Sequence, residues 1–309
     1  MYLGFLASCL KNLNLREKAK WASENGFKTL EVSCWPKEND RDYSSCDIDV
    51  ENLTQQEAKK IKDYFKEYDL KISSIAYYDN NLDSDLNKRA FINNHVKRCI
   101  DAAVMLDVPS VGTFVGRNID KSIEDNFNEF EEVFNELVYY ASKKEIKLMI
   151  ENCPMIGWQM KGVPGTISFT PELWREMFKR VPNKYFGLNY DPSHLLFQLI
   201  NYIDIIDEFK DRIFHVHAKD TEIFKDKLKL YGIFNQQIGV LRNHGSGYWR
   251  YRMPGMGQVD WNKLINALKQ NDYDGVISIE HEDPVYKGNE ERVKEGLNLG
   301  RKYLEQFLY

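Results

Sequence analysis

The sequence predicts a single (β/α)8 barrel, with one domain over residues 1–309. Short apolar segments alternate with longer amphipathic segments along the whole chain, and eight such pairs can be counted. The apolar segments are too short to be helices, and no Pro/Gly/Ser-rich linker divides the chain. Eight strands that each precede a helix are typical of this barrel. A doubly wound sheet also alternates, but no G-x-G-x-x-G motif follows the first strand.

The elements are predicted in order from these patterns. The strands are expected at residues 2–7, 27–33, 71–76, 110–114, 146–151, 185–191, 213–218 and 275–280. The helices are expected at residues 15–25, 54–68, 84–106, 121–144, 170–180, 195–210, 260–270 and 288–307. Three helix starts carry capping signals, because Asn14 precedes the first helix, Thr54 precedes Glu57 by three positions, and Pro171 follows Thr170.

One long segment, residues 221–259, departs from this alternation and follows the seventh predicted strand. Loops of this length in compact domains are usually functional, and here the loop would lie on the carboxyl face of the barrel, where active sites form. We expect residues 232–257 to fold over the barrel mouth and contact the substrate. The alternative is that the segment forms a subunit interface. The side chains expected to make either contact are Tyr248, Trp249, Arg250 and Arg252.

Composition excludes several classes of protein. The chain has 42 Lys+Arg and 47 Asp+Glu, a net charge of -5, so no basic excess suggests a nucleic-acid partner. The five cysteines contain no C-x-x-C pair, which argues against a disulfide framework and favours a cytoplasmic location. We expect neither a signal peptide nor a membrane-spanning helix, since no long apolar run is present.

Four predicted strands end in a side chain that can bind a metal ion. Glu151, Asp191 and Glu280 end the fifth, sixth and eighth strands, and His217 lies near the end of the seventh. A buried carboxylate at a strand end costs free energy unless it is paired or bound to a metal. Because barrel closure brings these strand ends to one rim, we expect one divalent ion bound by all four residues. Three carboxylates and one imidazole favour Mn²⁺, with Co²⁺, Mg²⁺ and Zn²⁺ as alternatives.

These motifs resemble the xylose isomerase-like TIM barrel family, which includes sugar isomerases, ketose 3-epimerases, an inosose dehydratase and apurinic endonucleases. The resemblance covers almost the whole chain. The segments that carry it are 150–152 (Ile-Glu-Asn), 191–194 (Asp-Pro-Ser-His), 215–220 (His-Val-His-Ala-Lys-Asp), 254–261 and 279–283. The resemblance implies that the four strand-end residues bind one divalent ion. It also implies that Glu151 and Glu280 act as an acid/base pair on opposite faces of a sugar.

Other residues are expected to bind the substrate or to support the site. His217 matches the second histidine of the family motif, so we assign it to the metal and expect His215 to be packed in the barrel. His194 matches the family's sugar-binding histidine, with a helix-start role as the alternative. Lys219 can meet a substrate oxygen at the rim, or else form a salt bridge with Asp220. The remaining predicted contacts are Tyr77, Trp158, Trp249, Arg250 and Arg252.

Two positions depart from the ketose 3-epimerase pattern. Gly157 stands where those relatives carry a second glutamate, and Ile223 stands where they carry an arginine. Because those residues hold the free end of the sugar in the relatives, their absence argues against a simple free ketohexose but not against the metal site. Aromatic side chains are available to cover a larger glycoside, although aromatic residues more often belong to the core.

The predicted function is therefore a divalent-metal-dependent isomerase or epimerase that acts on a keto-sugar or keto-glycoside through a metal-stabilised enediolate. The alternative is a metal-dependent lyase or dehydratase that removes the same proton. An apurinic endonuclease-like nuclease and a non-enzymatic sugar sensor are remote alternatives. The expected partner is a small carbohydrate, without nucleic acid or membrane, and a homo-oligomer is left open.

Overall fold

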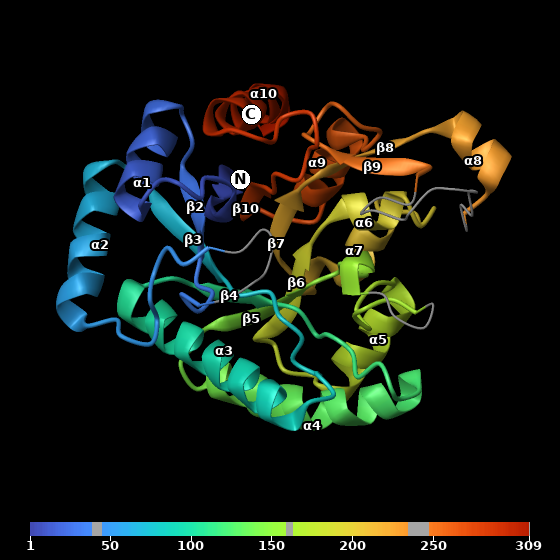
Figure 1. Ribbon diagram of the computed structural model, residues 1–309, viewed down its shortest axis with the longest axis horizontal. Coiled ribbons are helices and arrows are strands. Elements are labelled where there is room, and N and C mark those ends of the chain that lie inside the picture. Colours follow the sequence, from blue (N-terminus) through green and yellow to red (C-terminus); the bar gives the residue numbers. More distant parts are fainter. Residues whose placement is uncertain (39–44, 159–162, 234–246, 309) are drawn as a thin grey trace.

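The predicted barrel is present in the computed structural model, which describes residues 1–38, 45–158, 163–233 and 247–308. Eight parallel strands close into a barrel in the order β1-β10-β7-β6-β5-β4-β3-β2 (Figure 1). The sequence prediction of the fold class is confirmed. The barrel strands are β1 (Tyr2–Leu6), β2 (Thr29–Ser33), β3 (Lys71–Ala76), β4 (Ser110–Thr113), β5 (Lys147–Glu151), β6 (Phe186–Tyr190), β7 (Ile213–Ala218) and β10 (Val276–Ile279).

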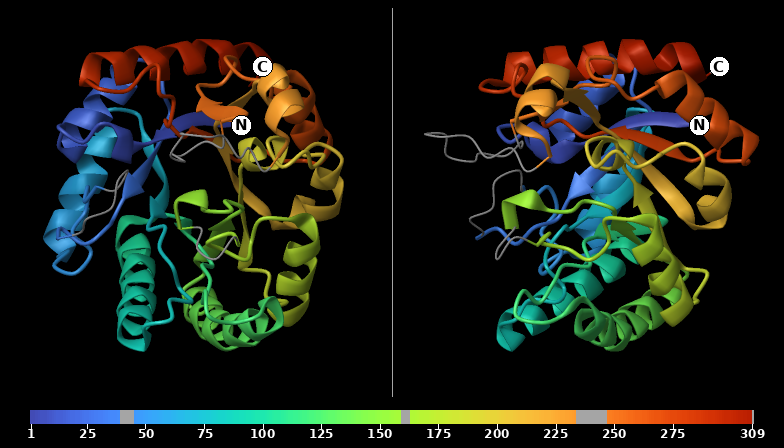
Figure 2. Two further views of the ribbon diagram at one scale, coloured as in Figure 1. Left: turned by 45° about the vertical axis from the view of Figure 1, so that its right-hand side comes forward. Right: turned by 90° about the vertical axis from the view of Figure 1, so that its right-hand side faces the viewer.

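Helices surround the strands, as two further views show (Figure 2). The longer ones are α1 (Leu15–Glu24), α2 (Gln55–Glu67), α3 (Leu86–Leu106), α4 (Ile123–Ser142), α5 (Pro171–Arg180), α9 (Trp261–Gln270) and α10 (Glu290–Leu308). The predicted capping signals are confirmed. Asn14 and Thr54 each form a reciprocal capping box with a glutamate three residues later, and the Thr170 side chain accepts a hydrogen bond from the backbone of Leu173.

Side chains alternate between the two faces of the barrel wall, and this alternation builds the core. In β2, Leu30 and Val32 are fully buried in the hydrophobic cluster, while Glu31 between them contacts His217. Such a strand is buried on both faces, with apolar side chains toward the helices and polar side chains toward the barrel interior. The apolar core therefore lies between strands and helices, and polar groups of the barrel interior lead up to the site.

The prediction of one helix over residues 195–210 is wrong. The structure has two short helices there, α6 (Pro192–Leu196) and α7 (Ile205–Phe209). Leu199 adopts a left-handed conformation with φ of 60°, which a continuous helix cannot contain. The side chain of Asn201 then accepts hydrogen bonds from the backbone of Ile203 and Asp204, which stabilises the turn.

The segment after β7 contains regular structure that the sequence analysis did not predict. β8 (Asp220–Ile223) and β9 (Trp249–Arg252) pair as an antiparallel hairpin, and α8 (Lys225–Tyr231) follows β8 at the outer edge of the molecule (Figure 1). Residues 234–246 of the predicted mouth-covering segment lie outside the described residues. In the described part of the chain, no helix is long and apolar enough to cross a membrane.

Candidate active site

The four predicted metal ligands come from four strands that are adjacent in the barrel. Glu151 ends β5, Asp191 follows β6 and caps α6, His217 lies in β7, and Glu280 follows β10. One ligand atom from each residue lies within 4.8 Å of the others. Because the carboxyl ends of parallel strands meet at one rim, side chains that are far apart in the sequence form one group.

The geometry of this group suits a divalent cation. Glu151, Asp191 and His217 are almost completely buried, and the Glu280 side chain is 13% exposed. The Oδ2 atom of Asp191 is buried without a hydrogen-bond partner among the described residues, while its Oδ1 accepts from the backbone of Ser193 at 2.7 Å. Lys219 Nζ and His194 Nε2 each lie 3.3 Å from Oδ2 as ion-pair neighbours. Three carboxylates and an imidazole are the donor set expected of a hard or borderline cation site.

The two histidines of β7 have different surroundings. His217 Nδ1 lies 3.2 Å from Glu151 Oε1 and 3.1 Å from Glu280 Oε2, so this nitrogen faces the candidate ligands. His215 Nδ1 lies 3.0 Å from Asn189 Oδ1, and its Nε2 lies 3.2 Å from Ser73 Oγ. The structure therefore brings His217 together with Glu151, Asp191 and Glu280 through Nδ1. His215 lies deeper in the barrel.

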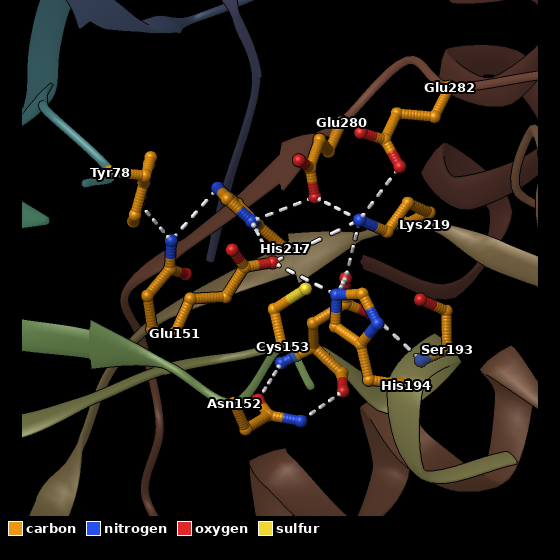
Figure 3. Close-up of polar contacts among 12 residues, drawn as sticks. Tyr78, Glu151, Asn152, Cys153, Ser193, His194, His217, Lys219, Glu280 and Glu282 are labelled. Carbon is orange, nitrogen blue, oxygen red and sulfur yellow. Dashed lines mark hydrogen bonds and ion pairs between the residues drawn. The ribbon is translucent and has the colours of Figure 1, made fainter. Parts of the chain in front are cut away.

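Lys219 places a positive charge between these carboxylates (Figure 3). Its Nζ atom lies 2.7 Å from Glu280, 3.3 Å from Asp191 and 3.3 Å from Glu282. Its neighbour Asp220 does not pair with it among the described contacts. Asp220 instead accepts hydrogen bonds from backbone N–H groups and from the Trp261 indole. Lys219 therefore contacts the candidate ligands rather than the carboxylate next to it in the sequence.

The protonation of the group follows from burial and from these charges. Burial alone would raise the pKa of Glu151, but Lys219, His194 and His217 together hold that pKa well below its usual value. Burial opposes a charge on His217, yet Glu31 and Glu280 raise its pKa well above the ordinary histidine value. Burial raises the pKa of Asp191. Glu151 is thus an ionised carboxylate, as a base or a metal ligand must be.

His194 lies at the edge of the group, on α6. Its Nε2 atom is 3.3 Å from both Glu151 Oε1 and Asp191 Oδ2, and its Nδ1 is 3.1 Å from the Tyr251 hydroxyl. The Asp191 side chain caps the short helix α6, and this helix carries His194. Asp191 therefore stabilises the start of the helix and, through it, the position of His194. Cys153 offers a third ligand atom within 4.8 Å of Glu151 and His194.

The aromatic residues expected at the substrate site have several locations. Tyr77 is buried against His95 and Trp35, whereas its neighbour Tyr78 donates to Glu31 at 2.7 Å. Trp158 packs on Phe114 with a ring distance of 5.6 Å, and the Phe114 ring lies 5.1 Å from Tyr78. Phe114 therefore links Trp158 to the site, while Tyr77 belongs to a neighbouring cluster of rings.

The predicted contacts on β9 are engaged with other parts of the protein. Trp249 stacks on Phe197 with 4.0 Å between ring centroids and 4° between planes. Arg250 and Arg252 both donate to Glu222, and Arg252 also donates to Asp283 at 2.9 Å. The pairs with Glu222 lie within the β8–β9 hairpin, and the Arg252–Asp283 pair joins the hairpin to the loop after β10, which carries Glu280.

Several site residues were missed by the sequence reasoning, among them Glu282, Asn189 and Asn152. Glu282 pairs with Lys219, Asn189 contacts His217, and Asn152 exchanges two hydrogen bonds with the backbone of Asp191. A signal existed for the first two, since each lies two positions from a predicted ligand and so points to the same side of an extended chain. Asn152 follows a predicted ligand directly, and periodicity gives no reason to select it.

The closed barrel carries a group of buried polar side chains at the carboxyl ends of four adjacent strands, the rim where barrel enzymes have their active sites. The sequence profile of the xylose isomerase-like TIM barrel family matches residues 19–303. The chain belongs to this family.

Proteins similar to this chain include dehydratases among its sequence relatives and sugar epimerases among the solved structures. The chain is 28% identical over 164 residues to the inosose dehydratase of Clostridium botulinum, an alignment that covers 52% of this chain and 49% of the dehydratase. The structure of D-psicose 3-epimerase from Clostridium cellulolyticum has a TM-score of 0.72 at 13% identity, covering 100% of this chain and 99% of the other. The structure of 3-keto-D-glucoside 4-epimerase from E. coli has a TM-score of 0.68 at 15% identity, covering 98% and 99%. At these identities the two structures establish the fold alone, and the chain spans about half the length of the dehydratase.

Proposed function

We propose that this protein is a divalent-metal-dependent sugar epimerase or isomerase acting on a keto-sugar or a keto-glycoside. The observation that carries the proposal is the convergence of Glu151 and Glu280 on one group. Their strands, β5 and β10, are separated in the barrel by β6 and β7, so the two carboxylates approach from different sides. Inversion of a carbon next to a carbonyl requires a base on one face and an acid on the other.

The residues around these carboxylates have matching roles in the proposed reaction. Glu151, held ionised by Lys219 and the two histidines, removes the proton beside the carbonyl. Glu280 returns a proton to the opposite face, and Lys219 and His194 donate hydrogen bonds to substrate oxygens. A divalent cation held by Glu151, Asp191, His217 and Glu280, with Mn²⁺ as our choice, would supply the positive charge that stabilises the developing oxyanion.

A lyase or dehydratase is the second candidate, supported by the similarity to inosose dehydratase. The first step would be the same proton removal by Glu151. Loss of a leaving group from the neighbouring carbon would then replace the return of the proton. Lys219 Nζ lies 3.3 Å from Glu282 Oε2 beside the candidate ligands, and this pair could supply the acid that protonates the leaving group.

One experiment tests the proposal and separates the two candidates. Protein loaded with Mn²⁺ is incubated in D₂O with a panel of keto-sugars and 3-keto-glycosides, and the products are followed by NMR. An epimer or isomer carrying solvent deuterium at the reacting carbon supports the proposal. An unsaturated or cleaved product favours the lyase, and no turnover of any panel member together with no cation uptake would reject both.

The small-carbohydrate partner and the cytoplasmic location are parts of the same proposal. All five cysteines are free thiols, which supports a reducing compartment.

A further inference from the structure

A buried carboxylate that is not a predicted metal ligand lies on the far side of His217. Glu31, in the middle of β2, is fully buried. Its Oε2 atom lies 2.9 Å from His217 Nε2, the nitrogen that faces away from Glu151 and Glu280. The His217 ring therefore lies between the candidate metal ligands on its Nδ1 side and Glu31 on its Nε2 side.

Glu31 is itself held in place by two hydroxyl groups. Tyr78 donates to Oε1 at 2.7 Å, and Ser278 donates to Oε2 at 3.1 Å. The Tyr78 hydroxyl fits there because residue 112 is glycine. A Cβ atom at Gly112 would lie 2.4 Å from that hydroxyl oxygen, which is closer than non-bonded atoms can approach. The carboxylate thus has a fixed position and a buried, ordered set of donors.

A second group competes for the same nitrogen. Asn189 Nδ2 lies 2.8 Å from His217 Nε2 and 2.6 Å from the Tyr78 hydroxyl. An amide N–H can donate to Nε2 only when that nitrogen carries no proton. A neutral ring would then carry its proton on Nδ1, where it would block a cation. Glu31 has the opposite preference, because a carboxylate accepts a hydrogen bond only from a protonated Nε2.

We propose that Glu31 is a positioning residue that keeps the proton on His217 Nε2 and so leaves Nδ1 as the nitrogen that binds the cation. The inference rests on the metal site of the proposed function. Hydrogen bonds with an ionised acceptor are about twice as strong as neutral ones, so Glu31 prevails over the Asn189 amide. A carboxylate behind a ligating histidine also orients the ring and makes it a stronger ligand.

The test measures the proton on Nε2 and cation binding separately. Nitrogen-15 NMR of the His217 ring is recorded for the metal-free and the Mg²⁺- or Zn²⁺-loaded protein, and Mn²⁺ affinity is measured by calorimetry. In the unaltered protein, Nε2 keeps its proton in both states, and cation binding removes only a proton from Nδ1. Glu31→Ala removes the proton from Nε2 of the metal-free ring and leaves the ring protonated on Nδ1 alone, and it weakens Mn²⁺ binding by about 10- to 100-fold.

Two further variants separate positioning from a general effect on folding. Glu31→Gln keeps an acceptor oxygen, so it retains the Nε2 proton and binds Mn²⁺ more tightly than the alanine variant. Asp47→Asn alters another buried carboxylate near β2, which pairs with Lys18 at 2.6 Å and does not contact the site, so it leaves the His217 ring and Mn²⁺ affinity unchanged.

Unchanged Nε2 protonation and Mn²⁺ affinity in folded Glu31→Ala, or in folded Glu31→Leu if the alanine variant does not fold, would overturn the inference. Failure of the proposed function gives a different pattern. The unaltered protein would then bind no cation, while the NMR of the metal-free ring would still report whether Glu31 or Asn189 controls Nε2.

Discussion

His215 and His217 differ by two positions in β7, and their neighbours give them different chemistry. Burial lowers the pKa of His215 to about 4, so this ring is neutral and serves as a hydrogen-bonding group between Asn189 and Ser73. His217 is surrounded by Glu31, Glu151 and Glu280, which favour a positive charge at the ring. A bound cation would replace the proton on Nδ1.

The two alanine variants of these histidines should therefore differ. His217→Ala removes one of four proposed ligands and should weaken Mn²⁺ binding by at least about 10- to 100-fold, the range seen when only an outer partner of a ligand is lost. His215→Ala should weaken binding less, because the ring nitrogens of His215 contact Asn189 and Ser73 and neither faces the other three ligands. Calorimetric titration of both variants with Mn²⁺ gives the ranking. The reverse order would show that the assignment of the ligand is wrong.

Neutral variants of the two glutamates test the acid/base pair. Glu151→Gln and Glu280→Gln should each lower kcat by at least about 10²-fold, because proton transfer by a positioned group contributes about 10²–10⁴-fold to rate. The measurement is turnover at saturating Mn²⁺, so that weaker cation binding does not account for the loss. Glu132→Gln on the exposed surface of α4 is the matched control. Near-normal kcat in either site variant would remove that residue from the pair.

At this scale the sequence identified the four candidate ligands because each ends an apolar strand, where a charged residue is conspicuous. It did not identify the roles of Asn189 or Glu282. Strand alternation places both on the same side of the chain as a predicted ligand, but which partners they contact depends on the side chains that meet inside the closed barrel. The sequence analysis selected Tyr77, but Tyr78 is the residue that contacts Glu31, whereas Tyr77 packs on His95. Adjacent residues at a strand end point to opposite sides, and the sequence does not show which side faces the site.

Between elements, a small ion-pair network joins α3 to the start of α4. Glu129 lies 3.0 Å from Arg89 and 2.7 Å from Lys121, and its side chain is only 14% exposed. Burial would raise the pKa of Glu129, but Arg89 and Lys121 lower it below the usual glutamate value. A carboxyl group with a lowered pKa in the folded protein stabilises that state above its unfolded pKa, and this stabilisation is lost as pH falls through the folded pKa.

Glu129→Gln should accordingly reduce the free energy of unfolding by about 1–2 kcal/mol at neutral pH. The difference from the unaltered protein should shrink as pH falls below about 4.3, the ordinary glutamate pKa, and vanish once Glu129 is protonated in both states. Urea denaturation between acid and neutral pH measures it. Glu132→Gln serves as the control on the same helix, and a difference that does not depend on pH would contradict the ion-pair explanation.

Periodicity predicted the long elements well and the region around the hairpin poorly. The helices α1 to α5 and α9 and α10 lie close to their predicted positions, since their apolar faces repeat over several turns. The break between α6 and α7 depends on the backbone of Leu199 and on side-chain caps from Asn201, which apolar periodicity does not show. The hairpin of β8 and β9 forms through pairing across a long insertion, which local sequence does not specify.

For the whole molecule, a cation that binds only the folded barrel should stabilise it. At a free Mn²⁺ concentration about 100 times its Kd, the gain is about 2.7 kcal/mol. For a chain of 309 residues this corresponds to a rise in Tm of several degrees. A thermal melt with and without Mn²⁺ checks this, and a chelator should reverse the rise. A Tm that does not respond to Mn²⁺, Co²⁺, Mg²⁺ or Zn²⁺ would argue against the cation site.

The contact between Glu31 and His217 also bears on how the protein folds. The two residues are 186 positions apart, and Glu31 and Ser278 are 247 positions apart. Contacts between such distant positions form late in folding, because the entropy of closing a long loop must be met before they stabilise the chain. The network around His217 is complete only once strands from both halves of the chain have joined. A cation bound there would then chiefly slow unfolding, since interactions absent from the folding transition state act on the unfolding rate.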